Sequence, residues 1–182
     1  MNTTETTNKM KELKLHGMYR MYENLRSQRA ADSLSHEELI AHLVDAEWDD
    51  RFNRKISRLI KGAGLRYPAH MEEIKYSKSR NLEKNRIIAL SRCDWIEKGS
   101  NILLAGATGT GKSFLACALG HQACLTRYKV RYANCMKLFS QLKYAKADGT
   151  YFKEMKQLQS KDLIILDDFG LNPFDNETRL ML

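Results

Sequence analysis

The sequence predicts an α/β fold in which helices flank a parallel sheet, preceded by a small all-helical region. From residue 101 onward, apolar runs of strand length alternate with longer amphipathic segments, which is typical of parallel strands joined by helices. Before residue 75, apolar residues recur at helical spacing instead. We therefore expect a helical domain over residues 1–75 and an α/β domain over residues 76–182, with a boundary between about Pro68 and Asn85.

The amino-terminal region is predicted to form two long helices. The first covers residues 6–30 and is interrupted or loosened near Gly17. The second begins at Ser35, whose hydroxyl can accept from free backbone N–H groups while Glu38 completes a capping box. It continues to Gly62 along one apolar stripe. The stripe consists of Leu39, Leu43, Trp48, Phe52, Ile56, Leu59 and Ile60.

Length and composition indicate an ordinary globular protein. With 182 residues, 43% hydrophobic and 29% charged, the chain can form one sizeable core and a small accessory unit. The first thirty residues contain no uninterrupted apolar segment, so we expect a cytoplasmic protein without a membrane partner. The four cysteines form no C-x-x-C pair and are expected to be reduced, buried thiols. They are Cys93, Cys117, Cys124 and Cys135.

The α/β region has a predicted order of elements. A short helix over residues 82–93 leads into it. Strands are expected over 101–105, 129–133 and 162–166, and helices over 112–126, 135–146, about 150–159 and from Asn176.

A glycine-rich loop, GATGTGKS, follows the first predicted strand. Its spacing, G-x-x-x-x-G-K-S, lets glycines turn the backbone tightly so that successive N–H groups and a helix N-terminus surround phosphate groups. Lys112 supplies a cation for the outer phosphates of ATP, and the Ser113 hydroxyl is placed to bind Mg²⁺. The expected nucleotide-binding residues are Gly106, Ala107, Thr108, Gly109, Thr110, Gly111, Lys112, Ser113 and Phe114.

Two carboxylates end the last predicted strand, LIILDD. Ligands of open parallel sheets gather at the carboxyl ends of the strands, so Asp167 is expected to hold Mg²⁺ and Asp168 to activate the attacking water. The alternative, a capping role for paired acids, is disfavoured by the glycine loop some fifty residues upstream.

Charge is distributed unevenly along the chain. Residues 32–50 hold seven acids and no lysine or arginine, whereas residues 51–92 hold twelve basic residues and three acids. This asymmetry favours a polyanionic partner over an ordinary solvated face, and no base-reading motif accompanies it, so we expect duplex DNA bound with weak sequence preference. The expected contacts share one side of the long helix: Arg51, Arg54, Lys55, Arg58 and Lys61.

A second basic segment runs from Lys137 to Lys161 and includes Tyr144, Tyr151 and Phe152. Its composition is compatible with DNA contact and equally with a solvated helix pair.

The chain resembles the IstB-type transposition helper ATPases, relatives of the DnaC-type helicase loaders within the AAA+ group of P-loop NTPases. The resemblance rests on GATGTGKS followed by FLACALGHQAC, on LIILDDFGL, and on the amino-terminal segments LKLHGM and AEWDDRFNRKISRLIKGAGL. GATGTGKS alone indicates only nucleotide binding. LIILDDFGL together with the amino-terminal helices is much more specific, and the resemblance covers nearly the whole chain.

This resemblance implies an AAA+ ATPase that forms a homo-oligomer on DNA with ATP and assists a transposase in selecting or activating its target. It assigns phosphate binding to the glycine loop, Mg²⁺ to Asp167 and catalysis to Asp168, with Lys112 at the phosphates. Three alternatives stay open: a replicative helicase loader, a nucleotide-dependent DNA-binding module with little hydrolysis, and, least favoured, a small-molecule kinase.

The AAA+ core is expected to be incomplete at its carboxyl end. Fourteen residues follow Asp168, which leaves no room for the sensor strand, the inter-subunit arginine and the final strand that the resemblance implies. Arg179 lies too close to Asp168 in sequence to serve as that arginine. Efficient hydrolysis is therefore less certain than nucleotide binding.

Overall fold

The computed structural model describes residues 3–28, 34–76, 82–171, 173 and 176–179. Its contacts separate two compact units, Met1–Ser57 and Arg58–Leu182, and the division falls within the continuous helix α3 (His36–Ala63). None of the helices in these ranges has the length and apolar composition needed to cross a bilayer.

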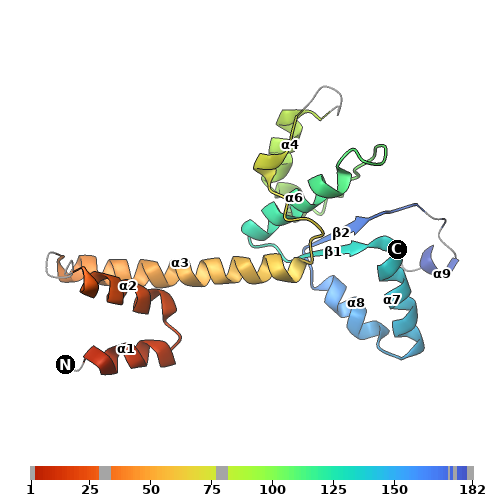
Figure 1. Ribbon diagram of the computed structural model, residues 1–182. Helices are drawn as coiled ribbons and strands as arrows, with labels where there is room; N and C mark the ends of the chain where they lie inside the picture. Colours follow the sequence, from red (N-terminus) through yellow and green to blue (C-terminus); the bar gives the residue numbers. More distant parts are fainter. Residues whose placement is uncertain (1–2, 29–33, 77–81, 172, 174–175, 180–182) are drawn as a thin grey trace. The chain divides into compact units, whose positions relative to one another are not determined.

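The first unit contains α1 (Thr3–Glu12), α2 (His16–Ser27) and most of α3 (Figure 1). The predicted interruption near Gly17 is present but lies a few residues earlier, because the chain turns between α1 and α2, where Lys14 has a φ of +58°. Gly17 lies inside α2 and not at the break. The capping box is confirmed: the Ser35 amide donates to Glu38 Oε2 at 2.8 Å, and the Glu38 amide donates to Ser35 Oγ at 3.2 Å.

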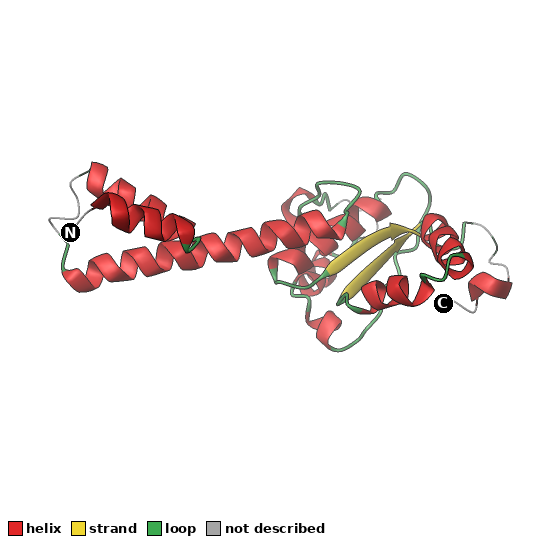
Figure 2. Ribbon diagram, turned by 90° about the horizontal axis from the view of Figure 1, so that it is seen from below, coloured by secondary structure: helices red, strands yellow, loops and turns green. Residues whose placement is uncertain are grey.

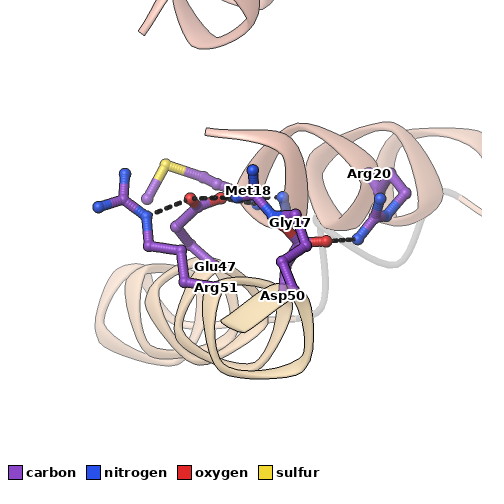
Figure 3. Close-up of polar contacts among 7 residues, drawn as sticks. Gly17, Met18, Arg20, Glu47, Asp50 and Arg51 are labelled. Carbon is purple, nitrogen blue, oxygen red and sulfur yellow. Dashed lines mark hydrogen bonds and ion pairs between the residues drawn. The ribbon is translucent and has the colours of Figure 1, made fainter. Parts of the chain in front are cut away.

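The start of α2 is held against α3 by Glu47. The carboxylate of this buried residue accepts hydrogen bonds from the Gly17 amide at 2.8 Å and the Met18 amide at 3.3 Å (Figure 3). Such first-turn amides have no partner within their own helix. Burial alone would raise the pKa of Glu47, but hydrogen bonds from Arg51 and from the two amides outweigh burial and lower the pKa. The carboxylate is therefore ionised at neutral pH, as the positive end of the helix dipole favours.

Gly17 is required by the close approach of α2 to α3. A Cβ atom at this position would lie 2.1 Å from the Ala46 carbonyl oxygen, far inside contact distance. We expect Gly17→Ala to lower the free energy of unfolding by about 1–3 kcal/mol, because the helices must move apart. The matched control is Gly62→Ala in α3, where an added Cβ meets nothing within 4 Å and should stabilise the helix by up to about 1 kcal/mol. Chemical denaturation followed by circular dichroism measures both, and equal effects would contradict the packing described.

The second unit contains a parallel sheet with helices around it (Figure 2). Strand β1 (Val130–Asn134) pairs with β2 (Leu163–Asp167), so that Asn134 lies opposite Asp167 at the carboxyl ends. The other elements, in chain order, are the short 3₁₀ helix η2 (Met71–Glu73) and the helices α4 (Lys84–Ser91), α5 (Asp94–Glu97), α6 (Lys112–Leu125), α7 (Cys135–Ala147), α8 (Tyr151–Gln159) and α9 (Asn176–Arg179).

Most elements predicted for this unit are confirmed. Helices α6, α7 and α8 agree with the predicted ranges to within a residue or two, α9 begins at Asn176 as expected, and both strands start one residue later than predicted. The helix predicted over residues 82–93 is instead two short helices, α4 and α5. Cys93 lies between them with a φ of +63°, which interrupts helical geometry.

The strand predicted over residues 101–105 is wrong. The described residues 101–107 form no strand, and β1 and β2 pair only with each other. A strand requires a neighbour that accepts its backbone hydrogen bonds, and an apolar run alone does not supply one. The apolar character of the run is explained in part by Leu104, which packs against the core cluster that contains Leu115.

Helix α6 forms the centre of the core, with Leu115, Ala118, Leu119 and Ala123 buried. The prediction of buried, unbridged cysteines is confirmed, because all four are free and fully buried. Burial raises the pKa of these thiols, that of Cys124 to about 11, so they remain protonated at neutral pH. They act as small core residues.

Candidate functional site

The glycine-rich loop leads directly into the N-terminus of α6. Gly109 and Gly111 adopt φ values of +81° and +84°, a region that is strained for any other common residue. Gly111 is the residue before α6, and its carbonyl accepts from the Leu115 amide at 3.0 Å. The first amides of α6 are thus presented where the loop ends, with the positive end of the helix dipole behind them.

Lys112 folds back over this loop. Its ammonium donates to the Gly106 and Ala107 carbonyls, both at 2.8 Å, and the Thr110 hydroxyl also donates to the Ala107 carbonyl at 2.8 Å. The positive charge is therefore held at the loop and not extended into solvent. An anion bound by the loop amides would meet that charge directly.

Asp167 joins the loop to the sheet. Its Oδ1 accepts from the Ser113 hydroxyl at 2.9 Å, a contact between residues 54 positions apart. Its Oδ2 accepts from the Tyr132 hydroxyl and lies 3.5 Å from Arg66 Nη1. Burial alone would raise the pKa of Asp167, but the hydrogen bonds from Tyr132 and Ser113 and the Arg66 charge outweigh burial and lower the pKa. Asp167 is accordingly a carboxylate at neutral pH.

Asp168 lies next to Asp167 with a different partner. Its backbone has a φ of +57°, and its Oδ2 accepts from the Asn134 side-chain amide at 2.7 Å. The Asn134 side-chain oxygen in turn caps α7 by accepting from the Lys137 amide at 3.2 Å. The helix cap fixes which way the amide points, so Asn134 orients the Asp168 carboxylate.

The structure brings the predicted phosphate and magnesium residues together. Gly106 to Ser113 form one loop and helix start, Ser113 contacts Asp167, and Asp168 follows directly. Phe114 packs near Tyr67, with 6.5 Å between ring centroids, and its role at a nucleotide stays a prediction.

Three side chains of this site were not predicted from the sequence: Arg66, Tyr132 and Asn134. Asn134 had a signal, since it ends β1 and parallel strands place their carboxyl ends side by side. Tyr132 lies two positions before Asn134 on β1, and its hydroxyl donates to Asp167. No sequence signal indicated Arg66, because it precedes Asp167 by 101 residues and the two meet only in the folded chain.

The predicted DNA-contacting residues differ in their surroundings. Arg51 donates to Glu47 at 2.6 Å, and Arg54 lies 2.5 Å from Asp50, which also pairs with Arg20 (Figure 3). Both are ion pairs within α3, formed with the two carboxylates that contact α2. All five predicted side chains, Lys55, Arg58 and Lys61 included, are exposed.

A parallel sheet, a glycine loop at a helix N-terminus and a serine–aspartate contact define the class of P-loop ATP-binding proteins. Comparison with protein families gives a narrower result: a family described as IstB-like ATP binding protein matches residues 8–182. The chain belongs to this family.

Two relatives illustrate the similarity. A Sinorhizobium fredii protein named as an insertion sequence ATP-binding protein, y4pL, is 36% identical over 96% of this chain and 71% of its own length. The ATP-binding protein named for insertion sequence IS1162 of Pseudomonas fluorescens is 38% identical over 98% of this chain and 78% of its own length. The resemblance inferred from the motifs is thereby confirmed.

Proposed function

We propose that the protein binds ATP with Mg²⁺, hydrolyses it, and assembles as a homo-oligomer on duplex DNA to assist the transposase of an insertion sequence. The observation that carries the proposal is the hydrogen bond from Ser113 to Asp167, which unites the glycine loop with the carboxyl end of the sheet. In a cytoplasmic protein this pair is suited to a phosphate-bound metal.

In this proposal, the glycine-loop amides bind the phosphates and Lys112 neutralises the outer ones. The donor set fits Mg²⁺, because Ser113 supplies a hydroxyl oxygen and Asp167 an ionised carboxylate, and Mg²⁺ takes oxygen ligands. When bound, Mg²⁺ would draw charge from the phosphate oxygens. Asp168, oriented by Asn134, would accept the proton of the attacking water.

Phosphate release measured with and without duplex DNA tests this activity. We expect release above background that DNA increases, because assembly on DNA would bring subunits together. Release at background under both conditions, with ATP still bound, would instead support a nucleotide-dependent module with little hydrolysis.

For DNA contact, we propose the basic side of α3, with Lys55, Arg58 and Lys61 exposed, and the α7–α8 pair. Tyr144 and Phe152 are largely exposed on these two helices, and Lys146 lies 5.4 Å from the Tyr151 ring. Aromatic faces among lysines suit bases and phosphates. Replacing Lys143, Lys146 and Lys153 by alanine should weaken DNA binding at low salt, and unchanged binding would remove the α7–α8 pair from the proposal.

A replicative helicase is the alternative protein partner. The names of both relatives refer to insertion sequences, which favours a transposase. Co-purification with a transposase encoded beside this chain, compared with a replicative helicase, decides between the two.

A further inference from the structure

The two oxygens of the Asp167 carboxylate are held by different partners. Oδ1 accepts from the Ser113 hydroxyl at 2.9 Å, at the start of α6. Oδ2 accepts from the Tyr132 hydroxyl and lies 3.5 Å from Arg66 Nη1. One oxygen therefore faces the residues of the glycine loop, while the other is held by two side chains that belong neither to the loop nor to α6.

Tyr132 is fixed by the sheet and by the core. On β1 it lies opposite Ile165 of β2, and Asp167 follows Ile165 by two positions, on the same face of the sheet. Such diagonal neighbours lie within reach of an aromatic side chain. The Tyr132 ring also packs against the core cluster that contains Leu115. The hydroxyl therefore donates to Asp167 from a fixed position.

Arg66 reaches the same oxygen from the segment that follows α3. The residues around it are anchored, because Leu65 and Ala69 pack in the core cluster that contains Leu115. The Arg66 guanidinium lies 5.2 Å from the centre of the Tyr67 ring, and the side chain is 51% exposed. Arg66 thus places a positive charge beside Oδ2 from an anchored backbone, without being part of the core itself.

These contacts limit what Asp167 can offer a metal ion. A carboxylate can bind a metal through one oxygen or through both. With Oδ2 held by Tyr132 and Arg66, only Oδ1 is available beside Ser113, whether the metal is bound directly or through water. Within the described part of the chain, no group of three or more histidine, cysteine, aspartate or glutamate side chains is placed to hold a metal. A metal at Ser113 and Asp167 therefore depends on few protein oxygens.

Mg²⁺ and Ca²⁺ differ in how they meet such a site. Mg²⁺ demands nearly octahedral geometry, keeps several waters, and is usually bound by one or two carboxylates together with phosphate oxygens. Ca²⁺ is larger, takes about six to eight oxygens, and often uses both oxygens of one carboxylate. A carboxylate that presents a single oxygen suits Mg²⁺ and deprives Ca²⁺ of a ligand.

We propose that Tyr132 and Arg66 are positioning residues that make this site select Mg²⁺ over Ca²⁺, by holding Oδ2 of Asp167 so that only Oδ1 faces the metal. The inference rests on the proposed function, which places Mg²⁺ at Ser113 and Asp167. It adds that the choice between the two ions is set by two residues that act through Asp167.

Titration of a fluorescent ATP analogue into the full chain, in Mg²⁺, in Ca²⁺ and with a chelator, tests this selectivity. For the native chain, Mg²⁺ should tighten ATP binding more than Ca²⁺ does. Tyr132→Phe removes only the hydroxyl and keeps the ring in the core. In this variant the ratio of the ATP affinity in Ca²⁺ to that in Mg²⁺ should rise about three- to tenfold, as expected when a residue that orients a metal ligand is lost. The affinity measured with the chelator should stay at the native value.

Arg66 provides an independent variant, because its half-exposed side chain can be replaced without disturbing the core. Arg66→Gln should raise the same ratio, whereas Arg66→Lys, which keeps the charge, should lie closer to the native ratio. Tyr128→Phe is the matched control. It also removes a hydroxyl that donates to a carboxylate, that of Glu97 at 2.9 Å, and it should leave the ratio unchanged.

The failure of this inference can be told apart from the failure of the proposed function. If Mg²⁺ raises the ATP affinity of the native chain but Tyr132→Phe and Arg66→Gln both keep the native ratio, the inference is wrong and the metal site stands. If Mg²⁺ has no effect on the native chain, the metal site is wrong and the inference falls with it. An equal loss of affinity in Mg²⁺, in Ca²⁺ and with the chelator would show a structural effect and would also overturn the positioning role.

Discussion

An Asp168→Asn variant is expected to bind ATP as tightly as the native protein and to hydrolyse it at least about 100-fold more slowly. The amide cannot accept the proton of the attacking water. The substitution should leave the local structure unchanged, since asparagine tolerates the left-handed backbone at this position, where φ is +57°, and can still bond to Asn134. Single-turnover hydrolysis measures the rate of the chemical step.

The control for this prediction is Asn134→Ala, which removes the group that orients Asp168 and leaves the carboxylate in place. The rate of ATP hydrolysis by Asn134→Ala should fall by less than that of Asp168→Asn, because the Asp168 carboxylate, no longer held by Asn134, still samples the productive orientation. If Asp168→Asn keeps the native rate, another residue activates the water, and the assignment of Asp168 is wrong.

An Asp167→Ala variant is expected to lose the contribution of Mg²⁺ to ATP affinity. In the native protein this carboxylate accepts a hydrogen bond from the Ser113 hydroxyl, and the pair is proposed to hold Mg²⁺, so Mg²⁺ should tighten ATP binding. Its removal should lower the affinity measured in Mg²⁺ by about 10–100-fold, the usual effect of losing a group that supports a metal. Titration of a fluorescent ATP analogue with Mg²⁺ and with a chelator measures the difference.

Two further measurements make this result interpretable. Loss of Asp167 leaves Tyr132 and Arg66 without their carboxylate, so a thermal unfolding curve must show that the variant is folded. Asp162→Ala is the matched control, since Asp162 bonds to the Lys129 amide at the start of the strands, away from Ser113. If Mg²⁺ still raises the ATP affinity of Asp167→Ala as much as that of the native protein, the assignment of the metal site is wrong.

The features predicted correctly from the sequence are those set by neighbouring residues. The capping box at Ser35 and Glu38 depends on a spacing of three residues, and the start of α6 follows from the glycine loop. Strand β2 combines an apolar run with two terminal acids. In each case the residues that determine the structure lie within one short segment.

Features that depend on distant contacts were missed. Residues 101–105 have the composition of a strand but no neighbouring strand among those described, and the turn between α1 and α2 was placed at Gly17, which instead serves a close helix contact. Arg66 reaches Asp167 only through the fold. Glu47–Arg51 and Asp50–Arg54 did have a signal, because both pairs have the i, i+4 spacing of helix ion pairs.

The most direct test of the account is calorimetric titration of ATP with Mg²⁺ into the native chain and into Lys112→Ala, with Lys129→Ala as an exposed-lysine control. The glycine loop, Lys112 and the Ser113–Asp167 pair predict saturable binding at one site for the native chain and the control. For Lys112→Ala they predict an affinity at least about 100-fold lower, as expected when a charged contact to phosphate is lost. A folded Lys112→Ala protein that binds ATP as tightly as the native chain would contradict the assignment of the glycine loop and Lys112 as the ATP-binding site.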